Sequence, residues 1–346
     1  MTKVRALALF SGGLDSILAC RVVAAQGIEV QAIKFVSPFF GHDILQDPEK
    51  YRQEMLHRYG IDVLIEDISF PYLQLLHNPA HGFGKNFNPC IDCKIFMLSR
   101  AREMMTGLGA SFLITGEVLG QRPMSQRRDT LNVIERDSGN RSILLRPLSA
   151  KLMKETEAER RGLIDRDRLL DFSGRGRSRQ IALAREFGIT DFPAPAGGCI
   201  LADPILSRRV ARMYAGDGVL RPEEITRVDI LLLLVGRQFL LPGGGWLILG
   251  RDEHENQKLK GLCQESDMLL SMENRPGPTA ILRRATSLPA GKLAEDLQVA
   301  ASLVVRYGKK MLTGPRAAEV DVYSRAGKNV LVAEPLADEM TLNIRI

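Results

Sequence analysis

Short apolar runs alternate with amphipathic segments at the start of the chain. The run Val4–Phe10 ends at Ser11-Gly12-Gly13, and the helical pattern Ile17–Gln26 follows and closes at Gly27. A second apolar run, Val30–Val36, comes next. A strand, a glycine turn, a helix and a strand make one βαβ unit, which implies a parallel sheet with a right-handed crossover.

The same alternation continues towards residue 200. Further helices are predicted at Lys50–Tyr59, Cys93–Leu108 and Ile181–Phe187, a charged helical segment at Leu152–Leu170, and strands at Val63–Asp67, Phe112–Thr115 and Ile143–Leu145. Ser173–Gln180 is rich in glycine and arginine and predicts an exposed loop, and Phe192–Gly198 predicts a rigid turn. Residues 1–208 are therefore expected to form a doubly wound α/β domain.

The pattern changes beyond about Leu206. Residues 209–227 are expected to be a connector that leads into a second, smaller α+β domain at 228–346. In that domain we predict strands at Ile230–Val235, Phe239–Leu241, Trp246–Leu249, Glu319–Ser324 and Asn329–Ala333 and a helix at Lys292–Tyr307.

Composition excludes several classes of protein. The 346 residues are 45% hydrophobic and 25% charged, which is typical of a globular protein and not of a disordered one. No apolar run is long enough to cross a bilayer, and Met1–Phe10 lacks the pattern of a signal peptide. We therefore expect a cytoplasmic protein without a membrane partner. The five cysteines, an odd number, argue against a disulfide framework. The net charge of +6 suits a polyanionic partner but does not identify one.

The segment Ser11-Gly12-Gly13-Leu14-Asp15-Ser16 is the most informative one, because it follows a predicted strand and opens a predicted helix. Unpaired backbone N–H groups and the helix dipole attract anions at such a position, and glycines let the backbone approach phosphate oxygens. Ser11 and Ser16 add hydroxyl donors, and Asp15 can hold Mg²⁺ against a pyrophosphate. The alternative is a plain glycine turn in which Asp15 or Ser16 only caps the helix.

Ser-Gly-Gly-x-Asp-Ser after the first strand resembles the signature of the PP-loop ATP pyrophosphatases, which share the HUP fold of the adenine nucleotide alpha hydrolases. The resemblance implies that ATP binds with Mg²⁺ and that attack at its α-phosphate releases pyrophosphate. The family includes amide-forming synthetases and tRNA thiolases, so the motif leaves the substrate open. The nucleotide site implied by the resemblance consists of Phe10, Ser11, Gly12, Gly13, Asp15, Ser16, Lys34, Gly116 and Gln121.

Cysteines are the second source of candidate chemistry. Cys90 and Cys93 are one helical turn apart where a helix is expected to begin, and a helix N-terminus lowers the pKa of a thiol. Cys199 follows Ala196-Gly197-Gly198, which can curl around a bulky group. Cys20 and Cys263 have no partner in the sequence and are expected to serve packing.

Three kinds of sulfur site remain open. Cys90, Cys93 and Cys199 suit a 4Fe–4S cluster with one iron left open. His77 and His81 could instead complete a zinc site with the first two cysteines. In the third alternative Cys199 carries a persulfide that Cys90 or Cys93 attacks.

These cysteines also extend the resemblance. Asn-Pro-Cys-x-x-Cys is similar to the tRNA 2-thiouridylases, and Cys-x-x-Cys with a distant third cysteine resembles thiolases that hold a 4Fe–4S cluster. The segment from Thr115 to Gln121, with Ser125-Gln126 and Arg146-Pro147-Leu148, resembles the 4-thiouridine synthetases, in which it lies beside the nucleotide. The resemblance covers roughly the first 200 residues and implies catalytic roles for Asp15, Cys90 and Cys199.

Arginines suggest contacts with RNA. Basic side chains on loops near a reactive thiol can bind the phosphate backbone, although a solvated charged surface is the alternative. In the second half, Gly250-Arg251 through Asn256 and Pro276-Gly277 resemble the RNA-binding domain of the NFACT proteins, with a role in dimerisation or stability as the alternative. The predicted RNA contacts are Arg127, Arg128, Arg175, Arg177, Arg179 and Arg251.

Together these features predict a tRNA sulfurtransferase that adenylylates a uridine carbonyl and replaces its oxygen with sulfur. Its partners would be tRNA and a sulfur donor, which could be sulfide, a cysteine desulfurase or a carrier protein. Two alternatives stay open. An amide-forming PP-loop synthetase would not need the cysteines, and a non-catalytic RNA-binding factor would release no pyrophosphate.

Overall fold

A computed structural model describes residues 4–195, 199–215, 220–309 and 316–346. The chain forms two compact units, Met1–Asp203 and Pro204–Ile346. The range 209–227, predicted as a connector, lies within the second unit and contains the end of one helix and the start of another.

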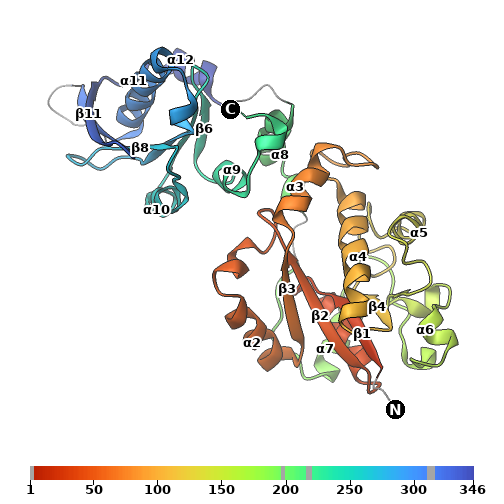
Figure 1. The fold of residues 1–346 in the computed structure, drawn as a ribbon. Helices are drawn as coiled ribbons and strands as arrows, with labels where there is room; N and C mark the ends of the chain where they lie inside the picture. Colours follow the sequence, from red (N-terminus) through yellow and green to blue (C-terminus); the bar gives the residue numbers. More distant parts are fainter. Residues whose placement is uncertain (1–3, 196–198, 216–219, 310–315) are drawn as a thin grey trace. The chain divides into compact units, whose positions relative to one another are not determined.

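The first unit is built on a five-stranded parallel sheet (Figure 1). The order is β3-β2-β1-β4-β5, so the chain adds strands outward from β1 in one direction and then in the other, which confirms the predicted doubly wound α/β fold. The strands are β1 (Arg5–Leu9), β2 (Glu29–Val36), β3 (Asp62–Asp67), β4 (Phe112–Thr115) and β5 (Leu144–Leu145).

Helices cover both faces of this sheet, and Figure 1 shows α4 in front of it and α7 behind it. One core joins Ala6 and Ala8 of β1 to α1, α2 and α7, whereas α4 packs against α5. The helices of this unit are α1 (Leu14–Ala24), α2 (Pro48–Tyr59), α3 (Ser69–His77), α4 (Cys90–Gly107), α5 (Arg128–Asp137), α6 (Glu157–Arg160) and α7 (Ser178–Glu186).

One predicted helix of the first unit is wrong. Leu152–Leu170 contains only the short helix α6 and a 3₁₀ turn at Arg166–Arg168. A capping box between Thr156 and Glu159 starts α6, and Gly162, at φ +65°, ends it. The predicted loop Ser173–Gln180 overlaps the start of α7, and the turn Phe192–Gly198 includes residues 196–198, which lie outside the described residues.

The second unit has a six-stranded antiparallel sheet in the order β11-β10-β8-β9-β7-β6, which confirms a separate α+β unit. The long helix α11 (Ala290–Tyr307) packs against four of its strands. Its strands are β6 (Arg237–Leu240), β7 (Trp246–Leu249), β8 (Met268–Ser271), β9 (Ala280–Arg283), β10 (Ala318–Ser324) and β11 (Gly327–Ala333). The other helices are α8 (Pro204–Tyr214), α9 (Arg227–Leu233), α10 (Glu253–Leu262) and α12 (Asp338–Ile344).

The predicted strand Ile230–Val235 is wrong, because most of it belongs to helix α9. A short apolar run does not distinguish a strand from a buried helix. Here Thr226 decides the outcome, since its backbone N–H donates to Asp229 at 2.8 Å and its hydroxyl accepts from the Asp229 N–H, which makes a capping box.

Buried carboxylates hold the second unit together. The two oxygens of Asp296, on α11, accept hydrogen bonds at 2.7 Å from the backbone N–H groups of Gly243 and Gly245 in the turn between β6 and β7.

Among the described helices, none combines the length and apolar character that crossing a membrane requires.

Candidate functional site

The predicted phosphate turn lies between β1 and α1, at the carboxyl end of the sheet. Gly12 adopts φ +84°, a left-handed conformation that favours glycine, and Gly13 is the N-cap of α1. The hydroxyl of Ser16 donates to the Gly13 carbonyl at 2.7 Å, and the hydroxyl of Ser11 accepts from the Gly13 N–H at 3.2 Å. Both serine side chains therefore brace the turn from within.

Two side chains approach this turn from other elements. Lys34, on β2, donates a hydrogen bond to the Ser11 carbonyl, and burial lowers the pKa of its ammonium group. A Cβ at Gly12 would lie 2.9 Å from the hydroxyl of Tyr51 on α2. The turn therefore requires glycine at position 12 for its backbone and for space, and it holds a cation beside the expected phosphate position.

Asp15 is the acidic group of the turn. Gln121 donates to its Oδ2 at 3.0 Å, while its Oδ1 is buried without a hydrogen-bond partner among the described residues. Burial raises the pKa of Asp15, and the hydrogen bond from Gln121 and the charges of Arg177 and Arg122 oppose the rise. A buried carboxylate oxygen left open suits Mg²⁺, which prefers oxygen ligands.

Gly116, at the end of β4, was predicted to contact the nucleotide. A Cβ at this position would lie 2.5 Å from the carbonyl carbon of Asp15 and from the backbone nitrogen of Ser16. Its backbone therefore packs directly on the first turn of α1, which places the 116–121 segment against the phosphate turn.

The three candidate thiols lie close to one another. Cys90 and Cys93 begin α4, and Asn86, four residues before Cys90, donates to the Ala202 carbonyl at 2.7 Å and so ties this segment to the one that carries Cys199. Burial raises the pKa of Cys93 to about 12, and the charges of Cys90 and Cys199 add to the rise. The structure therefore brings the predicted cysteines together from two distant segments.

The expected lowering of the thiol pKa at the start of α4 is wrong for Cys93. The hydroxyl of Tyr72, on α3, donates to the sulfur of Cys93, yet burial still raises the pKa of that thiol to about 12. Burial also raises the pKa of Cys199. The cost of removing a thiolate from water exceeds the effect of the helix N-terminus here.

Metal ligation is not preformed. Among the described residues no three His, Cys, Asp or Glu side chains form a group that could hold a metal ion. For zinc, His81 is already engaged, because its ring nitrogens lie 3.0 Å from carboxylate oxygens of Asp92 and Asp137.

Arg122 connects the phosphate turn to the thiols. Its positive charge lowers the pKa of Asp15 and that of Cys199 against the larger effect of burial at each group. One guanidinium is thus near enough to influence both. The backbone of its loop is folded back by hydrogen bonds from Gln126 N to Arg122 O at 3.2 Å and from Gly120 N to Gln126 O at 2.7 Å.

A buried charge network supports the 116–121 segment, and sequence reasoning missed it. Glu117 forms ion pairs with Lys94, the residue after Cys93, and with Arg146, whose Nε lies 2.9 Å from Glu117 Oε2. Despite burial, these two cations hold the pKa of Glu117 at about 2. Arg146 also pairs with Glu135 on α5. The one indication in the sequence was that Arg146 belongs, with the segment from Thr115 to Gln121, to the resemblance to the 4-thiouridine synthetases.

Four of the six arginines predicted to contact RNA have partners within the protein. Arg127 pairs with Asp129, Arg128 donates to the Leu152 carbonyl, Arg179 pairs with Asp171, and Arg251 pairs with Glu255. Arg177 influences Asp15 at the phosphate turn instead, and Arg175 is exposed.

The second unit contains a cavity of about 650 Å³ between α10 and the loop after β8. Both segments that resemble the NFACT proteins reach it, through Asn256 and through Pro276-Gly277. Asn256 also holds the cavity wall, since its Oδ1 accepts from Thr279 N at 2.9 Å. These segments therefore shape one site.

Comparisons with known proteins agree with this division. Residues 1–157 match the family described as "Thiamine biosynthesis protein (ThiI)", and residues 236–343 match "NFACT protein RNA binding domain". Cys199 and Arg177 lie outside the first match, so their place in the site rests on the geometry alone.

Several curated relatives are tRNA sulfurtransferases. That of Desulfurococcus amylolyticus is 30% identical over 146 residues, 42% of this chain and 29% of the relative. A "Probable tRNA sulfurtransferase" of Lysinibacillus sphaericus is 27% identical over 144 residues, 42% of this chain and 34% of the relative. The chain thus spans about a third of the length of the curated relatives that it matches.

Similar solved structures include a 4-thiouridine synthetase and a tRNA thiolase. A 4-thiouridine synthetase–RNA complex with bound ATP has a TM-score of 0.38 and 22% identity, covering 54% of this chain and 41% of that one. The U34-tRNA thiolase NcsA from Methanococcus maripaludis with its [4Fe-4S] cluster has a TM-score of 0.33 and 15% identity, covering 66% and 70%. The chain is therefore similar to the ThiI family over residues 1–157 and to the NFACT RNA-binding domain over residues 236–343.

Proposed function

We propose that this protein is an ATP-dependent tRNA sulfurtransferase that converts a uridine carbonyl into a thiocarbonyl. The observation that supports it most directly is the position of Arg122, which influences both Asp15 at the phosphate turn and Cys199 among the thiols. A site that activates a carbonyl oxygen with ATP and a site that delivers sulfur to the carbonyl carbon must meet at one carbonyl group.

In the first step the turn between β1 and α1 would hold the triphosphate, with Lys34 beside it. Mg²⁺ at Asp15 would offset the charge of the pyrophosphate. The uridine oxygen would bond to the α-phosphorus as the bond to pyrophosphate breaks, and the proton on the base nitrogen would pass to solvent. The guanidinium of Arg122 would stabilise the negative charge that develops at the α-phosphate.

In the second step the outer sulfur of a persulfide on Cys199 would add to the activated carbon, and AMP would leave with the oxygen. Cys90 would then attack the Cys199 sulfur, so that the two cysteines become a disulfide and the thiocarbonyl is released. The donor that loads Cys199 would be a cysteine desulfurase, a carrier protein or sulfide with an oxidant, and a thiol reductant would restore the cysteines. Cys90 suits this role better than Cys93, whose thiol is buried against Tyr72.

The second unit would hold the RNA substrate. The two NFACT-like segments meet at its large cavity, and polar side chains such as Asn256 and Arg275 line it. We expect RNA contacts there rather than at Arg251, whose guanidinium pairs with Glu255.

Two substitutions test the proposal together. Asp15→Ala should abolish RNA-dependent pyrophosphate release and thiouridine formation. Cys199→Ala should retain pyrophosphate release and lose thiouridine, because adenylylation does not need the sulfur. Cys263→Ala, in the second unit, is the matched control and should keep both activities.

The same experiment distinguishes the alternatives. If Cys199→Ala and Cys90→Ala leave the full reaction intact, the protein transfers nitrogen or another group. If the wild-type protein binds RNA without releasing pyrophosphate, it is a binding factor.

A further inference from the structure

An aromatic and apolar surface lies beside the thiols, and nothing in the reaction above uses it. The rings of Phe83 and Phe87 stack with centroids 4.1 Å apart at an interplanar angle of 23°. Met124 and Ile200, from two other segments, are also exposed, at 37% and 41%. We call these four residues, Phe83, Phe87, Met124 and Ile200, the aromatic platform.

The platform is a built feature of the fold and not a set of scattered side chains. A Cβ at Gly84 would lie 1.9 Å from the Cε of Met124, so the Met124 side chain rests on the 83–87 loop. Asn86, at φ +58°, turns that loop and donates to the Ala202 carbonyl two residues beyond Ile200. Contacts therefore join three segments that are distant in sequence, the 83–87 loop, the segment of Met124 and the segment of Ile200, and each carries apolar side chains of the platform.

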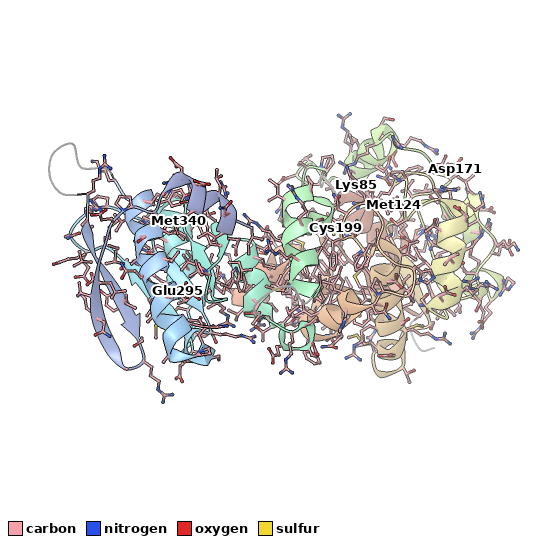
Figure 2. All side chains as sticks on the ribbon, turned by 90° about the horizontal axis from the view of Figure 1, so that it is seen from above. Lys85, Met124, Asp171, Cys199, Glu295 and Met340 are labelled. Atoms are coloured by element: carbon pink, nitrogen blue, oxygen red, sulfur yellow. The ribbon has the colours of Figure 1, made fainter. Side chains whose placement is uncertain are left out.

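Its location connects it to the thiols. Cys90 lies three residues after Phe87 and Cys199 lies one residue before Ile200. Figure 2 shows Lys85, Met124 and Cys199 gathered at one region of the first unit. Arg122, two residues before Met124, influences the pKa of both Asp15 and Cys199. The platform is thus carried by the same segments as Cys90, Cys199 and Arg122.

The chemistry of this surface suits a nucleobase. Phe83 is 39% exposed, so part of its ring is accessible to a ligand beside the stack with Phe87. Unpaired RNA bases stack on aromatic side chains, and an enzyme that reacts with a base must first take it out of its own stack. Lys85 and Arg122 are exposed and can bind the RNA phosphates next to the stacked base.

We propose that the aromatic platform stacks an unpaired pyrimidine base of the RNA substrate and so presents its carbonyl to the phosphate turn and Cys199. The proposal deepens the function proposed above and rests on it for the identity of the reacting group. The occupant is a single RNA base rather than a protein, since two stacked rings flanked by cations offer a small surface with a π-face and a positive rim.

Three variants of the full chain test it. Base–aromatic stacking is worth about 1–3 kcal/mol per base, which corresponds to roughly 5- to 150-fold. Phe83→Ala should lower both the affinity for a fluorescent oligouridylate and the kcat/KM for unmodified tRNA within that range. Phe83→Tyr keeps the π-face and should stay close to wild type. Phe70→Ala removes another exposed phenyl ring, 74% accessible on α3, and should change neither quantity.

The outcomes separate the platform from the overall function. Unchanged oligouridylate affinity and kcat/KM in Phe83→Ala would overturn the proposal, and so would equal losses in Phe83→Ala and Phe70→Ala. A fourth variant, Phe83→Leu, would also contradict the proposal if it matched Phe83→Tyr in both affinity and kcat/KM, because packing and not stacking would then explain the effect. Wild-type oligouridylate binding that depends on Phe83, without any thiouridine formed, would support the platform while refuting the sulfurtransferase.

Discussion

Replacing Gly116 with alanine would test whether β4 fixes the phosphate turn. The new Cβ would lie 2.5 Å from backbone atoms of Asp15 and Ser16, whereas ordinary van der Waals contact begins at 3.4 Å. The turn and β4 must therefore separate by 3.4 minus 2.5, or about 0.9 Å. Both crowded atoms belong to the backbone, so no side chain can rotate to relieve the contact.

The effects of this separation on folding free energy and on reaction rate can both be estimated. Overpacking of this kind costs about 1–3 kcal/mol of folding free energy. A shift of about 1 Å in a positioning element can lower a reaction rate by about 100-fold. We therefore expect Gly116→Ala to lower the rate of ATP-dependent pyrophosphate release by one to two orders of magnitude. This loss should be seen at temperatures where the variant is still folded, so unfolding would not explain it.

The matched control is Gly107→Ala at the end of α4, where a Cβ meets nothing within 4 Å. That variant should keep wild-type activity and gain up to about 1 kcal/mol, because alanine restricts the unfolded chain more than glycine does. Thermal melting and pyrophosphate release are measured on both. Wild-type kinetics in a folded Gly116→Ala protein would refute the inferred contact between β4 and the turn.

Three further predictions concern stability and pH. Glu117→Gln leaves the half-buried Lys94 without its carboxylate and the buried Arg146 with only Glu135, and should cost about 1–3 kcal/mol in thermal unfolding. The stability that Glu117 supplies in the wild type is present above pH 4.5 and should be lost as the pH falls towards 2, its pKa in the folded protein. Hydrogen bonds to Asp92 and, less strongly, to Asp137 raise the pKa of His81, so its stabilisation is complete below the usual value of about 6.5 and should fade as the pH rises through the higher folded value. A His81→Gln protein whose melting temperature kept the same pH dependence would contradict this. Asp296→Asn should cost about 1–3 kcal/mol by facing a buried backbone N–H with an amide, and urea unfolding followed by the fluorescence of Trp246, the single tryptophan, reports that unit directly.

The sequence predicted the elements whose signals are local. Ser11–Ser16 was recognisable because the strand, the glycines and the helix start are adjacent in the chain, and the parallel sheet followed from the repeated βαβ pattern. Ile230–Val235 was predicted as a strand because an apolar run alone has no period, and the capping box that makes it helical depends on two polar residues just before and within the run.

The site was harder to predict where its parts meet across the fold. Glu117 and its cationic partners come from three elements, so no spacing in the sequence marks the network. The pKa of the Cys93 thiol depends on burial, which outweighs the helix N-terminus that the sequence does show. Nothing in the sequence marks Arg122 as close enough to influence both Asp15 and Cys199, because the three residues come from separate segments.

The most direct measurement of the central claim is the stoichiometry of a single reaction. Purified protein, unmodified tRNA, ATP labelled at the α-phosphate, a sulfur donor and a thiol reductant are combined, and AMP, ADP and thiouridine are quantified together by chromatography and mass spectrometry. Adenylylation of the base predicts one AMP for each thiouridine and no AMP without RNA. ADP as the nucleotide product, or thiouridine formed in the absence of AMP, would contradict the account.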